Sequence, residues 1–415
     1  MKQKNYFVDL FAGCGGLSLG LENAGFIPAY VNELDPDAME SYLINRDEEF
    51  PLLREKYSSF DIQENLTQKK NALHKMNSSF EEDYGIKKGE LGLVVGGPPC
   101  QGYSAIGIRR TFTVDRKDIP SNYLFRDMIK VINTLSPKAF IFENVAGLMR
   151  GRWTPDGKSG EIWKDVQSAF MKIKGYEVGF ELVHAKSYGV PQNRPRIIMV
   201  GLRDDFSFED DPDTPARGLL PNATNDFPNP EELFGDIIDD NYRETLITTK
   251  YPSNATTKVQ KNLRKRRDGT VSKKGDVLLD HEYSNHSDKI IKKFQYMIDN
   301  NGEIPEEMKT KKFAQRVIPR KWGDGGPNIT ATSLPDDFVH YSQPRSLTVR
   351  EWARLQMFPD WYRFSGKRTT GGRRRAGDLS KGDWKRDTPK YTQIGNAVPV
   401  KLAEEIGKHL KSIMT

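Results

Sequence analysis

The sequence predicts an α/β protein built on an open sheet of the nucleotide-binding kind, and three patterns support this prediction. An apolar run over 6–11, a glycine-rich turn, a helix over 17–24 and a strand over 26–32 form a βαβ opening. Two later apolar runs, over 91–95 and 138–142, are predicted as buried strands. Each run ends in a polar or glycine-rich loop. Because ligands of open α/β sheets bind at the carboxyl ends of the strands, we expect the functional residues in these loops.

Further elements follow along the chain. A helix is predicted over 123–135, and strands over 176–183 and 196–202 flank the turn GVPQNRPR. The last helix, 400–413, carries apolar residues at helical spacing, which indicates one buried face.

The part of the chain after Asp204 has a different composition. It is rich in Pro, Asn, Asp and Thr, has few apolar runs and contains the basic piece KNLRKRRDGTVSKKG. A second basic segment, 363–386, carries nine Lys or Arg against two Asp, a local charge of +7. The net charge of the whole chain is +6, so the rest is nearly neutral (6 − 7 = −1). A concentrated basic segment suits a phosphate backbone, although a solvated charged loop is the plain alternative.

The overall composition excludes several classes of protein. With 415 residues, the chain can form more than one domain. Mean hydropathy is −0.67, and no apolar run approaches membrane length. The first strand starts too early to leave room for a secretory signal. We expect a cytoplasmic protein with no membrane partner.

The two cysteines, Cys14 and Cys100, lie in glycine-rich loops without the spacing of a disulfide framework or a zinc site. No metal site is therefore expected. Cys100 stands in GGPPCQGYS, where two prolines fix the backbone and glycines allow another molecule to approach. Free cysteines usually only pack in a core. The setting of Cys100 instead favours a thiol that is held and presented.

Five short motifs together carry a resemblance to a known family. They are FAGCGG at 11–16, PCQ at 99–101, ENV at 143–145, QNRPR at 192–196 and QIGNAVP at 393–399. In this order and context they resemble the DNA (cytosine-5) methyltransferases, the bacterial modification enzymes in particular. The resemblance covers the whole chain except a central block.

The resemblance implies an S-adenosylmethionine-dependent, Rossmann-like sheet domain that is interrupted by a smaller DNA-recognition domain. Residues 1–203 would form the first part of the catalytic domain, and 204–340 the target-recognition domain. Residues 341–390 would supply a bracing helix, at about 349–357, and the basic DNA-contacting segment. Residues 391–415 would return to the catalytic domain as its last helix.

The cofactor that the resemblance implies is S-adenosylmethionine. A dinucleotide fingerprint would need a glycine at position 18, which is Ser18, so a nicotinamide enzyme is disfavoured. By resemblance Phe11 packs on the cofactor, Glu33 binds the ribose and Asp61 binds the adenine amino group, although Asp61 could equally be an ordinary turn acid. The further expected cofactor residues are Gly13, Gly15, Gly16, Pro98, Asn396 and Val398.

The implied reaction is transfer of a methyl group to carbon 5 of a flipped-out cytosine in a specific double-stranded DNA sequence. Cys100 would add to carbon 6 and Glu143 would act as the acid. By resemblance Arg196 holds the cytosine carbonyl oxygen, and Arg194 supports Glu143 or the cofactor side. The expected DNA contacts are Gln101, Ser104, Arg109, Arg110, Thr330, Arg373, Arg374 and Arg375. In the loop before the 123–135 helix, Ser121 stands where the family usually has Arg.

Two other functions compete with this one. An RNA methyltransferase of the same family would carry a Cys-Phe-Thr tripeptide, and no cysteine follows Cys100. A catalytically inactive DNA-binding homologue is disfavoured because Cys100, Glu143 and both arginines are present. The expected partner is double-stranded DNA, bound by a monomer that is associated with the nucleoid in a prokaryote. A cognate restriction endonuclease could share the site without being needed for activity.

Overall fold

The computed structural model describes residues 4–99, 120–309, 315–322, 328–329, 337–370 and 387–414. The chain divides into two compact units. The first, here called the sheet unit, consists of Met1–Tyr188, Pro195–Thr224 and Val400–Thr415. The second, here called the loop-rich unit, consists of Gly189–Arg194 and Asn225–Pro399.

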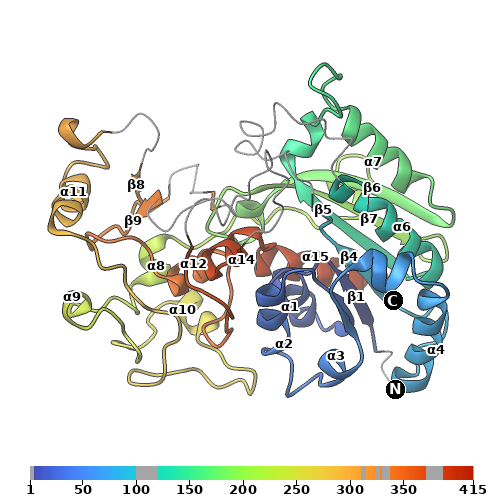
Figure 1. Ribbon diagram of the computed structural model, residues 1–415, viewed down its shortest axis with the longest axis horizontal. Helices are drawn as coiled ribbons and strands as arrows, with labels where there is room; N and C mark the ends of the chain where they lie inside the picture. The colour runs from blue at the N-terminus through green and yellow to red at the C-terminus, as the bar shows by residue number, and fades with distance from the viewer. Residues whose placement is uncertain are drawn as a thin grey trace. The chain divides into compact units, whose positions relative to one another are not determined.

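The sheet unit is organised around a seven-stranded sheet with the strand order β3-β2-β1-β4-β5-β7-β6 (Figure 1). Its strands are β1 (Tyr6–Leu10), β2 (Ile27–Asn32), β3 (Ser58–Ser59), β4 (Leu93–Gly96), β5 (Ala139–Val145), β6 (Tyr176–His184) and β7 (Pro195–Arg203). Strands β1 to β5 are parallel, and β7 pairs antiparallel with both β5 and β6. The predicted α/β fold class is confirmed.

The order of the strands reverses at β1. The chain first moves from β1 outward to β2 and β3, and it then returns to the other side of β1 with β4. Such a reversal leaves a crevice at the carboxyl ends of the two central strands, where open α/β sheets bind their ligands. The loops after β1 and β4 both start at this crevice, since Leu10 of β1 is in register with Gly96 of β4.

Helices cover both faces of the sheet. Tyr6, Val8 and Leu10 point into a large apolar core that they share with the helices α4, α6 and α7. Asp9 points to the opposite face, because side chains alternate along a strand, and there it accepts a hydrogen bond from Ser18 of α1. The helices of this unit are α1 (Gly16–Asn23), α2 (Pro36–Leu43), α3 (Leu52–Glu55), α4 (Ala72–Tyr84), α6 (Leu124–Leu135), α7 (Glu161–Met171) and α15 (Val400–Ile413).

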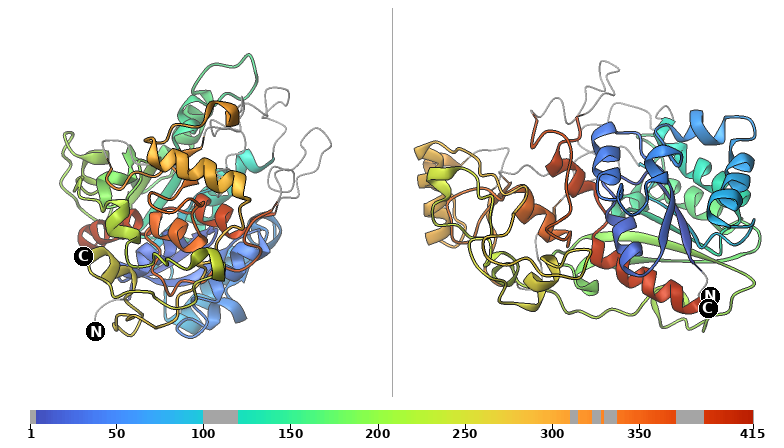
Figure 2. Two further views of the ribbon diagram at one scale, coloured as in Figure 1. Left: turned by 90° about the vertical axis from the view of Figure 1, so that its left-hand side faces the viewer. Right: turned by 90° about the horizontal axis from the view of Figure 1, so that it is seen from below.

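The last helix, α15, packs against α1, which is nearly four hundred residues away in the chain but beside it in space (Figure 2). The contact is very close: a Cβ atom at Gly20 would lie 2.4 Å from the Cβ of Ala403 and 2.4 Å from the carbonyl oxygen of Val400. The predicted apolar stripe of this helix, including Leu402 and Ile406, is buried. The N-terminal and C-terminal parts of the sequence therefore each contribute one helix to a packed pair.

The loop-rich unit has little regular structure. Its helices and strands are α8 (Pro230–Phe234), α9 (Tyr242–Thr245), α10 (Lys258–Leu263), α11 (Asp288–Asp299), β8 (Arg316–Val317), β9 (Phe338–Val339), α12 (Val349–Leu355) and α14 (Lys390–Asn396). All seven residues of α12 are buried, including Arg350, Glu351 and Arg354. This helix starts at the residue that the sequence predicted.

Candidate active site

The turn between β1 and α1 is the first part of the candidate site. Phe11, Gly13 and Gly15 all adopt left-handed backbone conformations, with φ of 58°, 56° and 86°. Glycine adopts such values freely, whereas an aromatic residue there costs about 1–3 kcal/mol and usually marks a ligand site. The α-carbon of Gly13 faces open space, since a Cβ atom there would meet nothing within 4 Å. The turn can therefore accept a ligand against its backbone before α1 begins at Gly16.

Glu33 follows β2 and is held by the same turn. The N–H of Gly13 donates to one carboxylate oxygen and the N–H of Asp35 to the other, each at 2.8 Å. Burial raises the pKa of Glu33, while these two backbone hydrogen bonds favour its charged form. A carboxylate fixed in this way can still accept further hydrogen bonds, because each oxygen has two lone pairs.

Asp61 follows β3 and stands two residues before a short π-helix, η1 (Gln63–Thr67). Its Oδ1 accepts hydrogen bonds from the N–H groups of Gln63 and Glu64, at 2.7 and 3.1 Å. The role as a turn acid is thus present in the structure. It leaves the second carboxylate oxygen for the cofactor role expected from the resemblance.

Two apolar side chains at the same edge were missed by the sequence analysis. Leu34 is 67% exposed and Phe60 is 51% exposed, and they adjoin Glu33 and Asp61 in the chain. The Asn32 side chain donates to the carbonyl oxygen of Phe60 at 2.9 Å, which ties the end of β2 to the segment after β3. The sequence signal for these two side chains is that each stands directly beside an acid at the end of a strand.

The exit from β4 passes close to Glu143 at the end of β5. A Cβ atom at Gly97 would lie 2.8 Å from Oε2 of Glu143, so a larger residue here would displace the Glu143 carboxylate. The Asn144 side chain donates to the carbonyl oxygen of Pro98 at 3.0 Å. The loop that leads toward Cys100 is therefore fixed to the ENV segment at Pro98.

Glu143 forms an ion pair with Arg196 of β7. Arg196 Nε lies 2.7 Å from Glu143 Oε1, and the two residues are only 7% and 9% exposed. Antiparallel pairing of Val145 with Arg196 brings the two side chains to the same edge. Burial lowers the pKa of Arg196, and the carboxylate of Glu143 opposes this effect. The ion pair to Glu143 comes from Arg196. Of the two roles that the resemblance offered for Arg194, support of Glu143 or of the cofactor side, its contacts agree with the second.

Arg194 belongs to the loop-rich unit and is fully buried there. Its guanidinium donates to the carbonyl oxygens of Gly395 at 2.8 Å and Ala397 at 3.0 Å. These carbonyls frame the segment that carries the predicted cofactor residues Asn396, which is exposed, and Val398, which is buried. Arg194 thus braces the QIGNAVP segment.

The other predicted site residues lie outside the described residues. They are Cys100, Gln101, Ser104, Arg109, Arg110, Thr330, Arg373, Arg374 and Arg375. In the described part of the chain, no group of three or more His, Cys, Asp or Glu side chains could hold a metal ion. Among the same residues, none of the helices has the length and apolar character needed to cross a membrane.

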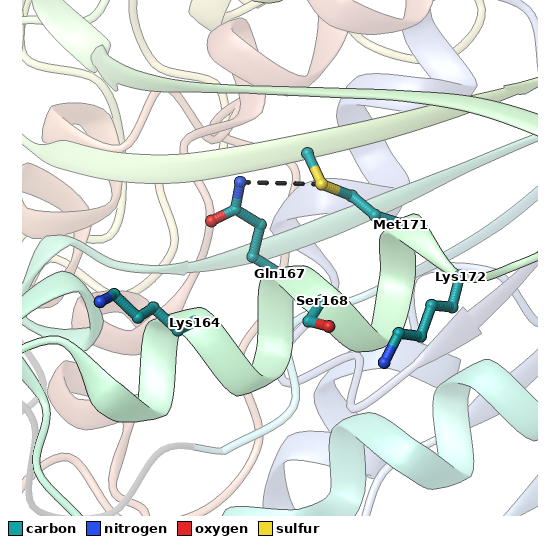
Figure 3. A pocket seen from close by; sticks show the side chains of 5 residues that line it. All are labelled: Lys164, Gln167, Ser168, Met171 and Lys172. Atoms are coloured by element: carbon teal, nitrogen blue, oxygen red, sulfur yellow. Dashed lines mark hydrogen bonds between the residues drawn. The ribbon is translucent and has the colours of Figure 1, made fainter.

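A shallow depression on the sheet unit is lined by one helix only. Figure 3 shows its residues on α7: Lys164, Gln167, Ser168, Met171 and Lys172. The Gln167 amide points to the sulfur of Met171 at 3.7 Å. The depression is lined only by residues of α7 and Lys172 directly after it, and none of these belongs to the candidate site.

The comparison with protein families identifies the family of this chain. The family model described as C-5 cytosine-specific DNA methylase matches residues 6–412. The chain belongs to this family. It is a DNA cytosine-5 methyltransferase, and the family uses S-adenosylmethionine.

This methylase is similar along its length to several curated bacterial enzymes. It is 29% identical to the type II methyltransferase M.DdeI of Desulfomicrobium norvegicum, over 97% of this chain and 88% of that protein. It is 30% identical to M.Sau96I of Staphylococcus aureus, over 99% of this chain and 76% of that protein. Among solved structures, a prophage-encoded DNA modification methyltransferase of E. coli has a TM-score of 0.65 at 21% identity and 99% coverage of both chains. That structural likeness supports the fold.

The residues of the methylase at the β1, β2 and β3 ends fit S-adenosylmethionine. Glu33 offers a fixed carboxylate for ribose hydroxyls, and the turn after β1 has an open backbone position at Gly13. Ser18 stands where a dinucleotide fingerprint would have its last glycine. Leu34 and Phe60 are exposed apolar side chains that suit the two faces of a flat base. Among the described residues at this edge, none favours a dinucleotide over a nucleoside.

Proposed function

We propose that this enzyme methylates carbon 5 of a flipped-out cytosine in a specific double-stranded DNA sequence through a covalent adduct on Cys100. The observation that carries the proposal is the buried Glu143–Arg196 pair, which stands at the strand edge beside the Pro98 end of the Cys100 loop. A carboxyl and a guanidinium side by side match the nitrogen 3 and carbonyl oxygen edge of cytosine.

The proposed chemistry begins with addition of the Cys100 thiolate to carbon 6, which forms a carbon–sulfur bond. Glu143 supplies a proton at ring nitrogen 3, while Arg196 donates to the carbonyl oxygen and holds the Glu143 carboxyl in place. The resulting enamine is nucleophilic at carbon 5. When bound, S-adenosylmethionine supplies an electrophilic methyl group on its sulfonium sulfur. Once carbon 5 has taken up the methyl group, a base removes the carbon 5 proton, the carbon–sulfur bond breaks and the thiolate of Cys100 is restored. Ring nitrogen 3 returns its proton to Glu143.

The proposed cofactor site combines Phe11, Glu33 and Asp61 with the turn glycines Gly13, Gly15 and Gly16. Glu33 would accept from the ribose hydroxyls and Asp61 from the adenine amino group. Leu34 and Phe60 are added to the residues expected from the sequence. Pro98, Asn396 and Val398 complete the proposed set.

The division of labour along the chain is also a proposal. Residues 204–340 would choose the DNA sequence, and 341–390 would brace that region and hold phosphates through Arg373, Arg374 and Arg375. The enzyme would act as a monomer, and any cognate restriction endonuclease would share the DNA site without being needed for methylation.

The deciding experiment is bisulfite sequencing of DNA from cells that express the wild type, Cys100→Ser, Glu143→Gln or Arg196→Lys. The wild type should protect cytosines at one sequence. Cys100→Ser should protect none, because a hydroxyl cannot be ionised enough to add to carbon 6. Glu143→Gln should lower the rate by about 10²–10⁴-fold through loss of the acid. Full protection of DNA by Cys100→Ser would contradict the proposed mechanism. Methylation of transfer RNA in place of DNA would contradict the proposal that DNA is the substrate.

Arg196→Lys tests whether Glu143 needs the shape of the Arg196 guanidinium or only a positive charge beside it. Lysine keeps the charge but not the planar fork, so we expect a fall in kcat with melting temperature nearly preserved. Arg203→Lys is the matched control, because Arg203 is on the same strand but pairs with the exposed Asp205.

A further inference from the structure

The strongest positive charge in the described part of the loop-rich unit lies on a protruding hairpin. Residues 258–276 carry eight Lys or Arg and two Asp, a net charge of 8 − 2 = +6. The hairpin itself, here defined as residues 264–274, continues from α10. Lys265 and Val271 form an antiparallel bridge, and the turn between them is closed by the N–H of Arg266, which donates to the carbonyl oxygen of Thr270 at 2.8 Å.

The base of the hairpin is anchored firmly in the unit. Arg264 is buried, pairs with Asp236 at 2.6 Å and stacks over the ring of Tyr251 at 3.8 Å. The neighbouring Leu263 is also buried, and its carbonyl oxygen accepts from the N–H of Asp360 at 2.7 Å. One arginine of the tip, Arg267, lies over the ring of Trp361 at 4.5 Å. The charges of the hairpin are thus presented on a fixed scaffold.

The two acids of the hairpin region are occupied by local contacts. Asp268 accepts from the N–H and hydroxyl of Thr270, at 2.8 and 2.7 Å. Asp276 accepts from the N–H of Lys273 at 2.9 Å and pairs with Arg266 at 3.3 Å. Neither acid forms an ion pair with a lysine of the hairpin in the part of the chain that the structure describes.

The remaining lysines face solvent. Lys261, Lys265, Lys273 and Lys274 are exposed, and within the described ranges none of them takes part in an ion pair. Like charges held this close on a rigid support repel one another, and the repulsion is relieved when a polyanion replaces the condensed counterions. A surface that only had to stay solvated would not need a buried arginine and a stacked arginine to fix its shape.

We propose that the hairpin of residues 264–274 is a sequence-independent contact to the phosphate backbone of duplex DNA. This inference rests on the proposed function for its choice of polyanion, and it assigns a role to residues outside the basic 363–386 segment. Lysines act on phosphates as flexible point charges, so they add affinity and salt dependence without reading bases. The hairpin would hold DNA of any sequence and take no part in the methyl transfer.

The test compares two triple variants with equal changes in net charge. The hairpin variant carries Lys265→Gln, Lys273→Gln and Lys274→Gln. The control carries Lys164→Gln, Lys172→Gln and Lys174→Gln on and after α7, where all three lysines are exposed. Binding of a duplex of about 40 base pairs is measured by fluorescence anisotropy over a range of salt concentrations. Melting temperatures check that both variants are folded.

Each lost phosphate contact should reduce the slope of log affinity against log salt by about 0.9, so the hairpin variant should lose about two to three units of slope. Duplexes with and without the methylated sequence should lose affinity by the same factor, and kcat at saturating DNA should not change. An unchanged slope, an equal loss in the control, or a loss confined to single-stranded RNA would overturn the proposal. Because binding is measured without methyl transfer, failure of the proposed reaction would leave this result readable.

Discussion

The two units of this methyltransferase are stabilised in different ways. The sheet unit buries a large apolar core between its strands and the helices α4, α6 and α7. The loop-rich unit also packs apolar side chains, such as Trp352, Phe358 and Tyr391, but it buries several charged side chains among them, around α12. A sheet with long helices can fix its geometry by packing, whereas irregular segments need directional contacts to do so.

Arg354 shows the directional contacts most clearly. Its guanidinium lies between two carboxylates, 2.5 Å from Asp236 and 2.6 Å from Asp360, and all three side chains are buried. Asp236 is shared with Arg264, and Asp360 accepts from the hydroxyl of Tyr251 at 2.8 Å. The segments 233–236, 251–264 and 354–360 are joined at this one point. We infer that buried ion pairs give the loop-rich unit a single arrangement, at a cost in desolvation.

Among the substitutions that distinguish the two units, Arg354→Met should have the largest effect on stability. The substitution keeps much of the volume but leaves two buried carboxylates without their shared partner, which should destabilise the loop-rich unit by about 3–5 kcal/mol. Hydrogen exchange should increase in that unit and stay unchanged in β1, β4 and β5. Arg320→Ala is the control, because the Arg320–Glu231 pair is 57% and 49% exposed and should contribute less than about 1 kcal/mol. Equal effects of the two substitutions would contradict the ion-pair account.

The second test is the pH dependence of each unit. Burial raises the pKa of Asp9 in the sheet unit to about 7, and it lowers the pKa of His281 to about 4 and of His340 to about 3 in the loop-rich unit. Because the pKa of Asp9 is raised in the folded protein, the stability that Asp9 contributes to the sheet unit is lost as pH rises from about 4 to 7. Lowered histidine pKa values contribute stability that is lost as pH falls below about 6.5.

When the pH is lowered from 7 to 5, the sheet unit should therefore gain stability. The loop-rich unit should lose about 2 kcal/mol of stability for each of the two histidines. Hydrogen exchange resolved by segment at both pH values measures this difference. Asp9→Asn should reduce the pH dependence of the sheet unit, leaving the part due to Glu33, whose pKa burial also raises, without affecting the loop-rich unit. Parallel changes in both units would show that the buried charges named here do not control the titration.

The smallest effect is expected at the α1–α15 contact. Gly20→Ala places a methyl group against the backbone carbonyl of Val400, so the two helices must move apart at a cost of about 1–3 kcal/mol. Ser412→Ala, on the exposed side of α15, should change the melting temperature little. A Gly20→Ala protein that melts with the wild type would show that this helix pair does not limit the stability of the sheet unit.

The sequence predicted the strands and the last helix well because each is a local pattern. Apolar runs ended by glycine, proline or an acid are visible without knowledge of the fold, and α15 has the predicted bounds, Val400–Ile413. The contact between Glu143 and Arg196 could not be found this way, since it depends on antiparallel pairing of β5 with a strand fifty residues later. Arg194 and Arg196 stand two residues apart in the QNRPR motif, but they belong to different units, which the sequence does not reveal.

The two apolar side chains added to the proposed cofactor site could not be found from the sequence, for a physical reason. Exposed side chains such as Leu34 and Phe60 have no periodic pattern, and an apolar residue beside an acid is common in any sequence. Their exposure becomes informative only when the fold places them at the ends of neighbouring parallel strands.

The most direct test of the proposed mechanism is a covalent trap. The wild-type enzyme is incubated with S-adenosylmethionine and a duplex that contains 5-fluorocytosine at the methylated position. Fluorine cannot leave as a proton, so the adduct between carbon 6 and Cys100 should persist through denaturation, and mass spectrometry should locate it on the peptide that contains Cys100. Cys100→Ser should give no adduct. A wild-type enzyme that methylates ordinary DNA but forms no adduct, or forms it at another residue, would contradict the mechanism.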